Sequence, residues 1–396
     1  MSAVTPVPDS DDAAILGAID KWIEKKVRPV AMDLEHADAW PADLVDDMIE
    51  LGLFGALVAP EYGGLGLSAQ TYAHIVARIS EEWMSLTGIF NSHLMMALVV
   101  QKFGTDTQKE YWLPRFASAE MRGALALTEP DAGTDLQAIR TTAVRKGDVY
   151  VVNGAKTWIS NAIQGQVCAL LVKTDLNAQP RHKGISMLIA PKVDPETREP
   201  LKGVRNGKKL EKLGYNGIDS GEFIFEDYEC SADLCLVGGE EGRGFLMATG
   251  GLEIGRINVA ARGVGIARRA LSESVNYAQI RQTMGKPIAE HQAIQLKLAE
   301  MAVQARAAEL LVADAARAYD AGGRVDLEAG MAKFFASEAA LSLATEALRI
   351  HGAYGYSKEL VLERLYRDAP LLCIGEGTNE MQRLIIARQL VARNPA

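Results

Sequence analysis

The sequence is poor in aromatic residues and in positive charge, and each shortage excludes a class of protein. Phe, Trp and Tyr make up 6% of the 396 residues, whereas alanine is plentiful, a balance that favours helices. Lys and Arg number 42 against 51 Asp and Glu, so the net charge is −9 and general nucleic-acid binding is not expected. With 48% hydrophobic and 23% charged residues, the composition is that of a folded globular protein and excludes wholesale disorder.

Long apolar runs and targeting signals are also lacking. No run of 18 apolar residues occurs, so we expect no transmembrane helix and no membrane partner. The first residues, MSAVTPVPDSDD, lack both the basic start and apolar stretch of a signal peptide and the arginines of a transit peptide. The four cysteines form no CxxC pair and have no metal-ligand spacing; they are Cys168, Cys230, Cys235 and Cys373. We therefore expect reduced thiols, no metal site and a cytoplasmic protein.

The hydrophobic pattern divides the chain into three parts, for which we predict domains over 1–122, 123–236 and 237–396. The first is predicted to be helical, with Ser10 as a cap and helices over 69–82 and around 93–103. In the last, apolar residues recur at steps of four and three from Ile294 to Ala315. This spacing predicts one long helix over 290–319, packed against others in a bundle.

The middle part has short strand-like runs between turn signals. These runs lie at 149–152, 167–172, 185–189 and 223–225, and the pairs Asn153-Gly154 and Gly147-Asp148 are typical of turns. Because no helical pattern separates the runs, an antiparallel β-sandwich or barrel is predicted. The fold class is therefore α+β, in the order helices, strands, helices.

Several familiar site motifs are missing. The run Gly263-Val264-Gly265 lacks a third glycine and follows no strand, so it is not a dinucleotide-binding fingerprint. The run GVRNGK at 203–208 has the wrong spacing for a phosphate loop. No GxSxG or HExxH occurs, and the six histidines do not cluster as metal ligands.

Three segments carry polar residues suited to a site, although each has an ordinary structural explanation. Residues 127–135 (LTEPDAGTD) form a turn-rich stretch that could hold a polar cofactor edge or be a plain loop. Trp158, in the strand-like run KTWISN, would normally be a core residue. The run GKP at 285–287, with His291 and Gln292 ahead of the long helix, could equally be a turn between helices.

A fourth segment, GEGTNE at 375–380, gives the sharpest prediction. It follows the apolar run at 370–374, and Thr378 and Glu380 suit the cap and first turn of a helix over 381–391. Glu376 is then a single carboxylate between two glycines and beside apolar residues. Desolvation would raise its pKa, which suits a general base, whereas an exposed turn glutamate is the alternative.

Together these segments resemble the acyl-CoA dehydrogenase family over residues 12–393. The resemblance is carried in order by LTEPDAGTD, NGAKTWISN at 153–161, Arg281 with Thr283 and GKP, the pair His291-Gln292, HGAYGY at 351–356, and EGT at 376–378. It implies an N-terminal helical domain, a middle β-barrel and a C-terminal four-helix bundle. It also implies a flavoprotein oxidoreductase of fatty acid metabolism, of the kind that acts in β-oxidation.

The resemblance implies FAD-dependent oxidation of acyl-CoA to trans-2-enoyl-CoA. Glu376 matches the base that removes the α-proton, while the β-hydride passes to flavin N5. The backbone N–H of Glu376 and a ribityl hydroxyl of FAD would hold the thioester carbonyl as negative charge develops there. Some relatives carry the base directly before an arginine on an earlier helix. Here that position is Gly255, before Arg256, so the alternative base is absent.

The same resemblance assigns binding residues position by position. FAD contacts are implied for Leu125, Leu127, Thr128, Gly133, Thr134, Trp158, Ile159, Ser160, Gly377, Thr378 and Glu380. The adenosine-pyrophosphate end is implied to meet Arg281, Thr283, His291 and Gln292, with Arg349, Ile350, Gly352 and Ala353 from a neighbouring subunit. The CoA portion is implied to meet Thr134, Glu253, Arg256 and Arg324, and the acyl group to meet Gly375, Met95 and Met96.

Three departures from the family pattern bear on cofactor contacts and specificity. Arg349 stands where Gln is common and Ala353 where Gly is common, so contacts there differ in detail. Gly375 replaces the bulky aromatic that often precedes the base. This change predicts a wider cavity and a branched, cyclic or otherwise wide acyl group. A short-to-medium acyl chain is the other expectation for the substrate.

The implied partners are an acyl-CoA substrate, an electron-transferring flavoprotein as electron acceptor, and further copies of the chain in a homotetramer built as a dimer of dimers. Two alternatives stay open. One is an acyl-CoA oxidase on the same fold, in which oxygen reoxidises the flavin and peroxide forms. The other is a noncatalytic CoA- or flavin-binding module, which the retained base, tryptophan and arginines disfavour.

Overall fold

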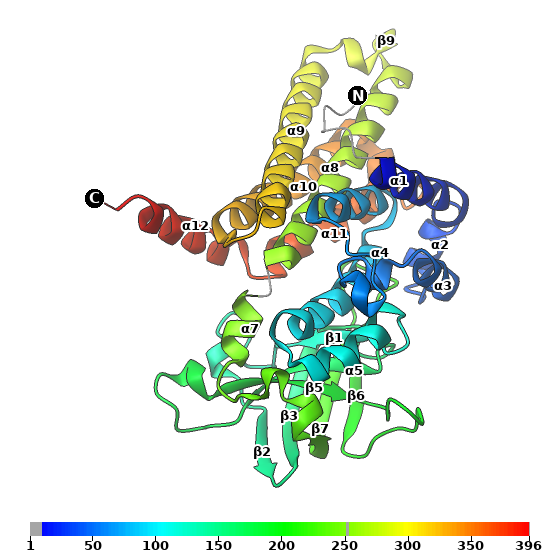
Figure 1. Ribbon diagram of the computed structural model, residues 1–396. Helices are drawn as coiled ribbons and strands as arrows, with labels where there is room; N and C mark the ends of the chain where they lie inside the picture. The colour runs from blue at the N-terminus through cyan, green and yellow to red at the C-terminus, as the bar shows by residue number, and fades with distance from the viewer. Residues whose placement is uncertain (1–9, 251–252, 396) are drawn as a thin grey trace.

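The computed structural model describes residues 10–250 and 253–395, which form a sheet flanked by two sets of helices. Figure 1 shows the sheet at one end of the molecule and the long C-terminal helices at the other. The order helices, strands, helices predicted from the sequence is confirmed. The predicted Ser10 cap lies outside the described side chains.

The N-terminal helices are short except for one. They are α1 (Ser10–Trp22), α2 (Ala31–His36), α3 (Ala42–Glu50), α4 (Ala69–Phe103) and α5 (Asp106–Ala117). The start of α4 is fixed by Ser68, whose side chain accepts a hydrogen bond from the backbone N–H of Thr71. At α5, Thr105 and Gln108 form a reciprocal capping box.

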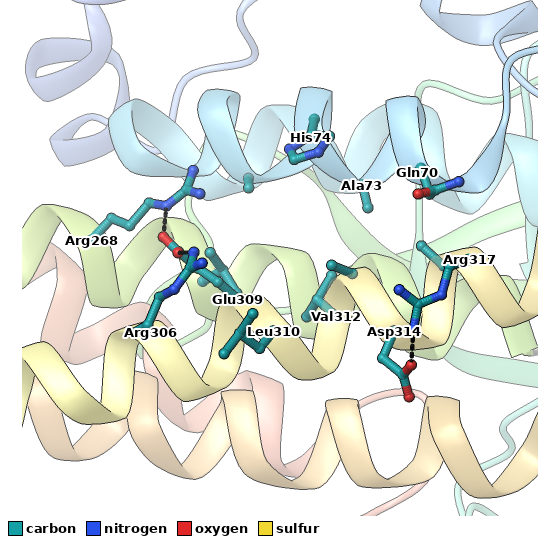
Figure 2. A pocket seen from close by; sticks show the side chains of 14 residues that line it. Gln70, Ala73, His74, Arg268, Arg306, Glu309, Leu310, Val312, Asp314 and Arg317 are labelled. Carbon is teal, nitrogen blue, oxygen red and sulfur yellow. Dashed lines mark hydrogen bonds and ion pairs between the residues drawn. The ribbon is translucent and has the colours of Figure 1, made fainter. Parts of the chain in front are cut away.

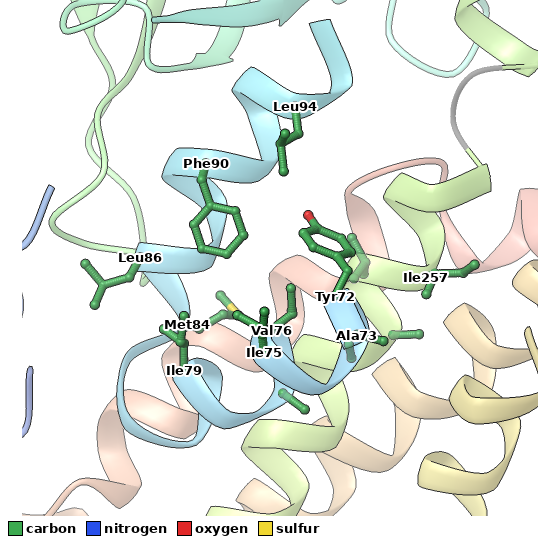
Figure 3. Packing of buried hydrophobic residues seen from close by; sticks show 14 of the residues in the cluster. Tyr72, Ala73, Ile75, Val76, Ile79, Met84, Leu86, Phe90, Leu94 and Ile257 are labelled. Atoms are coloured by element: carbon green, nitrogen blue, oxygen red, sulfur yellow. The ribbon is translucent and has the colours of Figure 1, made fainter. Parts of the chain in front are cut away.

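Helix α4 is broken once, at Trp83, where φ is −157° and ψ is 103°. The helix predicted over 69–82 is confirmed, but the second stretch begins well before position 93. Both halves are buried on most faces, so the periodicity that would mark the second start is missing. Figure 3 shows Tyr72 from the first half beside Phe90 from the second, with ring centroids 6.2 Å apart.

By length and composition α4 could also cross a membrane, and it is the one such candidate among the described residues. However, 89% of its apolar window is buried inside the protein. A helix buried to this extent packs in the core of the protein.

The middle part is one curled sheet with the strand order β1-β4-β2-β3-β7-β6, in which β5 also pairs with β4. Its strands are β1 (Gly123–Ala126), β2 (Thr142–Lys146), β3 (Val149–Ser160), β4 (Val167–Lys173), β5 (Ile185–Pro191), β6 (Val204–Lys209) and β7 (Ser220–Ser231). The purely antiparallel prediction was wrong in one respect, because β1 runs parallel to β4 and β2 meets β4 in parallel at one position. Strand β1 was missed because its sequence, GALA, contains no β-branched residue.

The pair Asn153-Gly154 is not the predicted turn. Strand β3 continues through it, and its pairing with β7 shifts register between Val152 and Gly154, which marks an irregularity of the β-bulge type. Gly154 has φ 145°, and a Cβ there would lie 2.5 Å from Thr141 Oγ1. Glycine is therefore required by close packing and not by a hairpin. The turn predicted at Gly147-Asp148 is present.

The C-terminal part is a bundle of long helices around α10. Its elements are α8 (Glu253–Ile280), the strands β8 (Gln282–Thr283) and β9 (Lys286–Pro287), α9 (Gln292–Asp320), α10 (Asp326–His351), α11 (Leu362–Ile374) and α12 (Asn379–Arg393). Two short helices before it, α6 (Ala232–Cys235) and α7 (Gly244–Gly250), pack against the sheet. The predicted long helix is α9, and its stripe is buried from Met301 to Ala315. Helix α10 packs against α8, α9, α11 and α12, and α4 packs across α8.

Candidate active site

Glu376 lies in the short turn between α11 and α12, and the backbone there is unusual. Gly375 ends α11, Glu376 has φ 54° and Gly377 has φ 82°. A left-handed glutamate is strained, and such outliers persist where the surroundings hold them, commonly at functional sites. The Thr378 side chain accepts the backbone N–H of Met381 at 3.4 Å, so the predicted helix cap is confirmed.

Side chains of α10 and α12 hold this turn through hydrogen bonds to its backbone. The Nζ of Lys333, a fully buried side chain, donates to Gly377 O and Asn379 Oδ1, both at 2.8 Å. The Gln382 side chain donates to Glu376 O and Gly377 O, each at 3.3 Å. Burial lowers the pKa of Lys333 to about 8, although Cys373, Glu376 and Glu380 counteract this. Sequence reasoning missed both residues.

The Glu376 carboxylate faces Gly255 on α8. A Cβ built at Gly255 would lie 3.1 Å from Glu376 Oε2 and 3.1 Å from Met95 Sδ. Gly255 therefore borders the base candidate directly and leaves room for its carboxylate. Met95 belongs to this site as predicted by position, whereas Met96 is buried against Gly123 of β1, where its Sδ is the atom nearest to a built Cβ.

Burial raises the pKa of Glu376, and the positive charges of Arg262, Arg256 and Lys333 oppose this rise. Among the described residues the backbone N–H of Glu376 donates to no protein acceptor. The site thus offers a carboxylate that can accept a proton and, beside it, an unused hydrogen-bond donor.

The three charged residues predicted at the CoA portion gather where α8 and α10 begin. Arg256 donates to Asp326 Oδ1 at 3.0 Å, and Arg324 pairs with the other oxygen of Asp326. Glu253 accepts the backbone N–H of Val325 at 3.3 Å. Burial would raise the pKa of Asp326, but the hydrogen bonds from the two arginines outweigh it and hold that pKa low. Arg324 is exposed, and the buried Nε of Arg256 has no partner among the described atoms.

The 127–135 turn and the Trp158 segment are joined by a buried ion pair. Lys156 Nζ donates to Glu129 Oε1 at 2.7 Å and to Leu127 O at 3.1 Å. Thr157 N–H donates to Thr128 O at 2.9 Å. Burial lowers the pKa of Lys156 to about 8 despite the opposing charge of Glu129. This pair, which sequence reasoning missed, fixes the second register shift of β3, next to Trp158.

Trp158 itself is not a core residue. Its φ is 59° and its side chain is 59% exposed. The other residues predicted at the flavin ring lie on β1, in the 127–135 turn or on β3, and most of them have polar or apolar groups open to solvent. Half-buried are Leu125, Leu127, Thr128 and Ser160; exposed are Gly133 and Thr134; buried is Ile159. An uncovered indole beside hydroxyls and backbone edges fits a planar, polar cofactor such as FAD.

The residues predicted at the adenosine end lie elsewhere. Thr283 Oγ1 and His291 Nε2 are 2.9 Å apart at the β8–β9 tip, with Arg281 and Gln292 beside them. Figure 1 shows β9 at the end of the bundle farthest from the sheet. Within one chain the structure therefore does not bring these residues to Trp158. Ile350 is buried in α10, whereas Arg349, Gly352 and Ala353 are exposed.

A separate hollow lies between the first half of α4, α8 and α9 (Figure 2). Its rim carries Arg268 and Arg306, which both pair with Glu309 at 2.5 and 2.8 Å. None of the residues predicted from the sequence lines it, and its arginines already have carboxylate partners.

Sequence reasoning also missed Arg262, Tyr72 and Asn258, which adjoin the Glu376 region. Arg262 follows Gly255 by seven residues and therefore lies on the same face of α8. A charged residue inside the otherwise apolar run VAARGVGIA was the available signal.

Comparison with known proteins gives consistent matches over the whole chain. The family models described as acyl-CoA dehydrogenase N-terminal, middle and C-terminal domain match residues 9–120, 124–228 and 242–391. The human mitochondrial short-chain specific acyl-CoA dehydrogenase is 40% identical over 93% of this chain and 87% of its own.

Two solved structures are also similar. Butyryl-CoA dehydrogenase from Megasphaera elsdenii superposes with a TM-score of 0.92 at 33% identity, covering 98% of this chain and 100% of its own. A chain in a structure described as the electron transferring flavoprotein of Acidaminococcus fermentans has a TM-score of 0.92 at 35% identity, with the same coverage.

Proposed function

Because this chain belongs to the acyl-CoA dehydrogenase family, whose members are FAD-dependent oxidoreductases acting on the CH–CH bond of acyl-CoA, we propose that Glu376 is its catalytic base. The observation that carries the proposal is the placement of the Glu376 carboxylate against Gly255, with an unused backbone N–H beside it. The substrate is proposed to be the CoA thioester of a short acyl group, in line with the likeness to short-chain and butyryl-CoA dehydrogenases.

In this mechanism Glu376 removes the α-proton of the thioester, and the product is the trans-2-enoyl-CoA. Its raised pKa makes it a stronger base than an exposed glutamate, and the positive charges of Arg262, Arg256 and Lys333 limit that rise. The Glu376 N–H holds the thioester carbonyl, where negative charge develops as the proton leaves. When bound, FAD supplies the acceptor for the β-hydride.

Positioning comes from the residues around the turn. Lys333 donates to Gly377 O, and Gln382 donates to Glu376 O and Gly377 O, so hydrogen bonds to its carbonyls hold the turn in place. The CoA portion is proposed to meet Glu253, Arg256 and Arg324, with Thr134 from the sheet part. Arginine suits the phosphates because its planar fork donates two parallel hydrogen bonds.

FAD is proposed to lie against Trp158 with its flavin end, held by the residues of the 127–135 turn and by Gly377, Thr378 and Glu380. Its adenosine end is proposed to meet the β8–β9 tip and the Arg349–Ala353 stretch of another copy, because one chain keeps these groups apart. A homotetramer built as a dimer of dimers satisfies this requirement. We further propose an electron-transferring flavoprotein as acceptor and a cytoplasmic location; the likeness to the Acidaminococcus chain supports the first.

The test is anaerobic reduction of the bound flavin. The purified holoprotein is mixed with straight-chain, branched and cyclic acyl-CoAs, and bleaching of the oxidised flavin band is followed. Wild type should bleach, and Glu376→Gln should bleach about 10²–10⁴-fold more slowly, which is the range that a general base contributes.

The matched control is Glu359→Gln. Glu359 is an exposed glutamate just before the start of α11, at the opposite end of that helix from Glu376, and this variant should behave as wild type. Equal rates in Glu376→Gln and wild type would refute the assignment of the base. Turnover with oxygen alone, with peroxide formed, would show an oxidase in place of a dehydrogenase.

A further inference from the structure

Arg262 is a buried cation without an anionic partner. It lies on α8 and is 5% exposed. Its Nη1 donates to Tyr215 Oη at 3.0 Å and its Nη2 to Thr87 O at 3.4 Å, while its Nε has no acceptor among the described atoms. It forms no ion pair with any described carboxylate, unlike Arg256 and the half-buried Arg269 on the same helix.

The side chains around Arg262 are polar, and their hydrogen bonds hold its guanidinium in one position. Tyr72 Oη donates to Asn91 Oδ1 at 3.0 Å and accepts from Asn258 Nδ2 at 2.8 Å, and Asn258 Oδ1 has no partner among the described atoms. Tyr215 reaches Arg262 through space that a side chain at position 88 would occupy, since a Cβ on Gly88 would lie 1.6 Å from Tyr215 Oη.

Arg262 and its polar neighbours lie on the parts of α8 and α4 that extend away from the base candidate, Glu376. On α8, Gly255 and Arg262 are seven residues apart and share one face; on α4, Met95, Asn91 and Thr87 follow at steps of four. Seven residues correspond to about 10 Å along a helix, and side chains lean toward the helix N-terminus. The Arg262 side chain therefore leans along α8 toward Gly255 and Glu376, and among the positive charges that lower the pKa of Glu376 its effect is the largest. Figure 3 shows the Tyr72 hydroxyl pointing away from Ile257, toward the side of Leu94 and Phe90 on the second half of α4.

An uncompensated cation in a protein interior is costly, and it is retained where an anion arrives to pair with it. Glu376 does not pair with it, and Glu376 loses its own charge when it accepts a proton. Uncharged acyl chains would leave Arg262 unpaired after binding. Two donors here match a carboxylate: the unpartnered Nε of Arg262 and the hydroxyl of Tyr215, whose oxygen accepts from Arg262 and whose own O–H can donate.

We propose that the acyl group carries a carboxylate at the end remote from the thioester, so that the substrate is the CoA thioester of a short dicarboxylic acid. Arg262 binds this carboxylate, assisted by the Tyr215 hydroxyl, while Tyr72 and Asn258 form the polar wall beside it. The inference rests on the proposed function, because it places the reacting carbons beside Glu376. The missing side chain at Gly375 leaves open space next to those carbons, where a built Cβ meets nothing closer than Leu371 O at 3.5 Å.

The experiment compares glutaryl-CoA with valeryl-CoA and with the methyl ester of glutaryl-CoA, using the FAD-loaded protein and anaerobic flavin bleaching. Wild type should reduce fastest with glutaryl-CoA. Arg262→Met should lower the ratio of kcat/KM for glutaryl-CoA to kcat/KM for valeryl-CoA at least about 100-fold, because it leaves a buried carboxylate unpaired; the loss of a cation near Glu376 affects both substrates and cancels in this ratio. Arg262→Lys should restore part of the loss. Arg145→Met, an exposed arginine on β2, is the control.

Preference of wild type for valeryl-CoA or the ester, or an equal loss for all three thioesters in Arg262→Met, would overturn the inference. If Arg262→Met does not fold, the wild-type comparison of acid and ester decides alone.

A binding measurement separates this inference from the proposed function. Calorimetry on the Glu376→Gln holoprotein should show tighter binding of glutaryl-CoA than of valeryl-CoA, and equal binding would overturn the inference. Absence of flavin bleaching by every thioester would refute the proposed function, while the binding preference still tests Arg262.

Discussion

Moving the base to position 255 tests the geometry of the site most directly. A Cβ at Gly255 would touch the Glu376 carboxylate, at 3.1 Å from Oε2, so a glutamate there would compete for the same place. Two carboxylates about 4 Å apart repel by about 4 kcal/mol at an effective dielectric constant of 20. This corresponds to about three pKa units, so both cannot be ionised near neutral pH. Gly255→Glu in the wild-type background should therefore slow flavin reduction and lower Tm.

The same substitution should help when Glu376 is absent. Glu376→Gly keeps the turn, because φ 54° suits glycine, and it keeps the backbone N–H while removing the base. We expect this single variant to reduce the flavin about 10²–10⁴-fold more slowly than wild type. Gly255→Glu combined with Glu376→Gly should recover about 10-fold or more, since a carboxylate again lies beside the reacting carbons.

The assay is single-turnover flavin reduction under anaerobic conditions, with all four proteins compared at several pH values. Gly255→Ala in the Glu376→Gly background separates the carboxylate from the effect of a side chain on the helix. A double variant that binds FAD and acyl-CoA but reduces no faster than Glu376→Gly would refute the placement of position 255 beside the substrate.

Three further outcomes are expected. Lys333→Met removes the shortest hydrogen bond to Gly377 O and to Asn379 Oδ1 and leaves only the longer ones from Gln382 and Ser337. This should cost about 1–3 kcal/mol of stability and slow flavin reduction more than it weakens substrate binding; Tm and a KM-against-kcat comparison check this. Because burial raises the pKa of Glu376, kcat/KM should rise with pH through a value above 4.5. Protonated Glu376 also contributes stability at low pH, and this contribution should be lost as pH rises through the raised pKa. Glu376→Gln should remove both effects, as pH–rate and pH–Tm profiles would show. Gly375→Tyr should penalise branched thioesters more than straight ones in kcat/KM, and equal losses would contradict a widened cavity.

The features that could be predicted from the sequence are those set by local spacing. The stripe that ends at Ala315 predicted α9, and Thr378 predicted the start of α12, because helix periodicity and capping act within a few residues. Glu376 stood out because glycines flank it. The turn predicted at Asn153-Gly154 was wrong because packing of Gly154 against Thr141 overrides the local hairpin signal. The sequence does not reveal that Thr141 is the partner.

The features that could not be predicted depend on contacts between distant segments. Lys333 holds a turn that lies 44 residues further along the chain, and its own helix gives it no distinguishing pattern. Lys156 looks like an ordinary strand lysine until its partner Glu129 is placed beside it in the interior. Arg262 was visible as a charge in an apolar run, but its lack of a counter-ion is a property of the folded interior alone.

The separation of Trp158 from the β8–β9 tip has a consequence for how the protein behaves on dilution. If FAD spans these groups from two copies, as proposed, cofactor binding and subunit association are thermodynamically linked, and each strengthens the other by the same factor. Retention of flavin then follows mass action in protein concentration, so that a dilute sample loses its yellow colour and its association together. Added FAD would favour assembly, and the flavin content of a preparation would report on its oligomeric state.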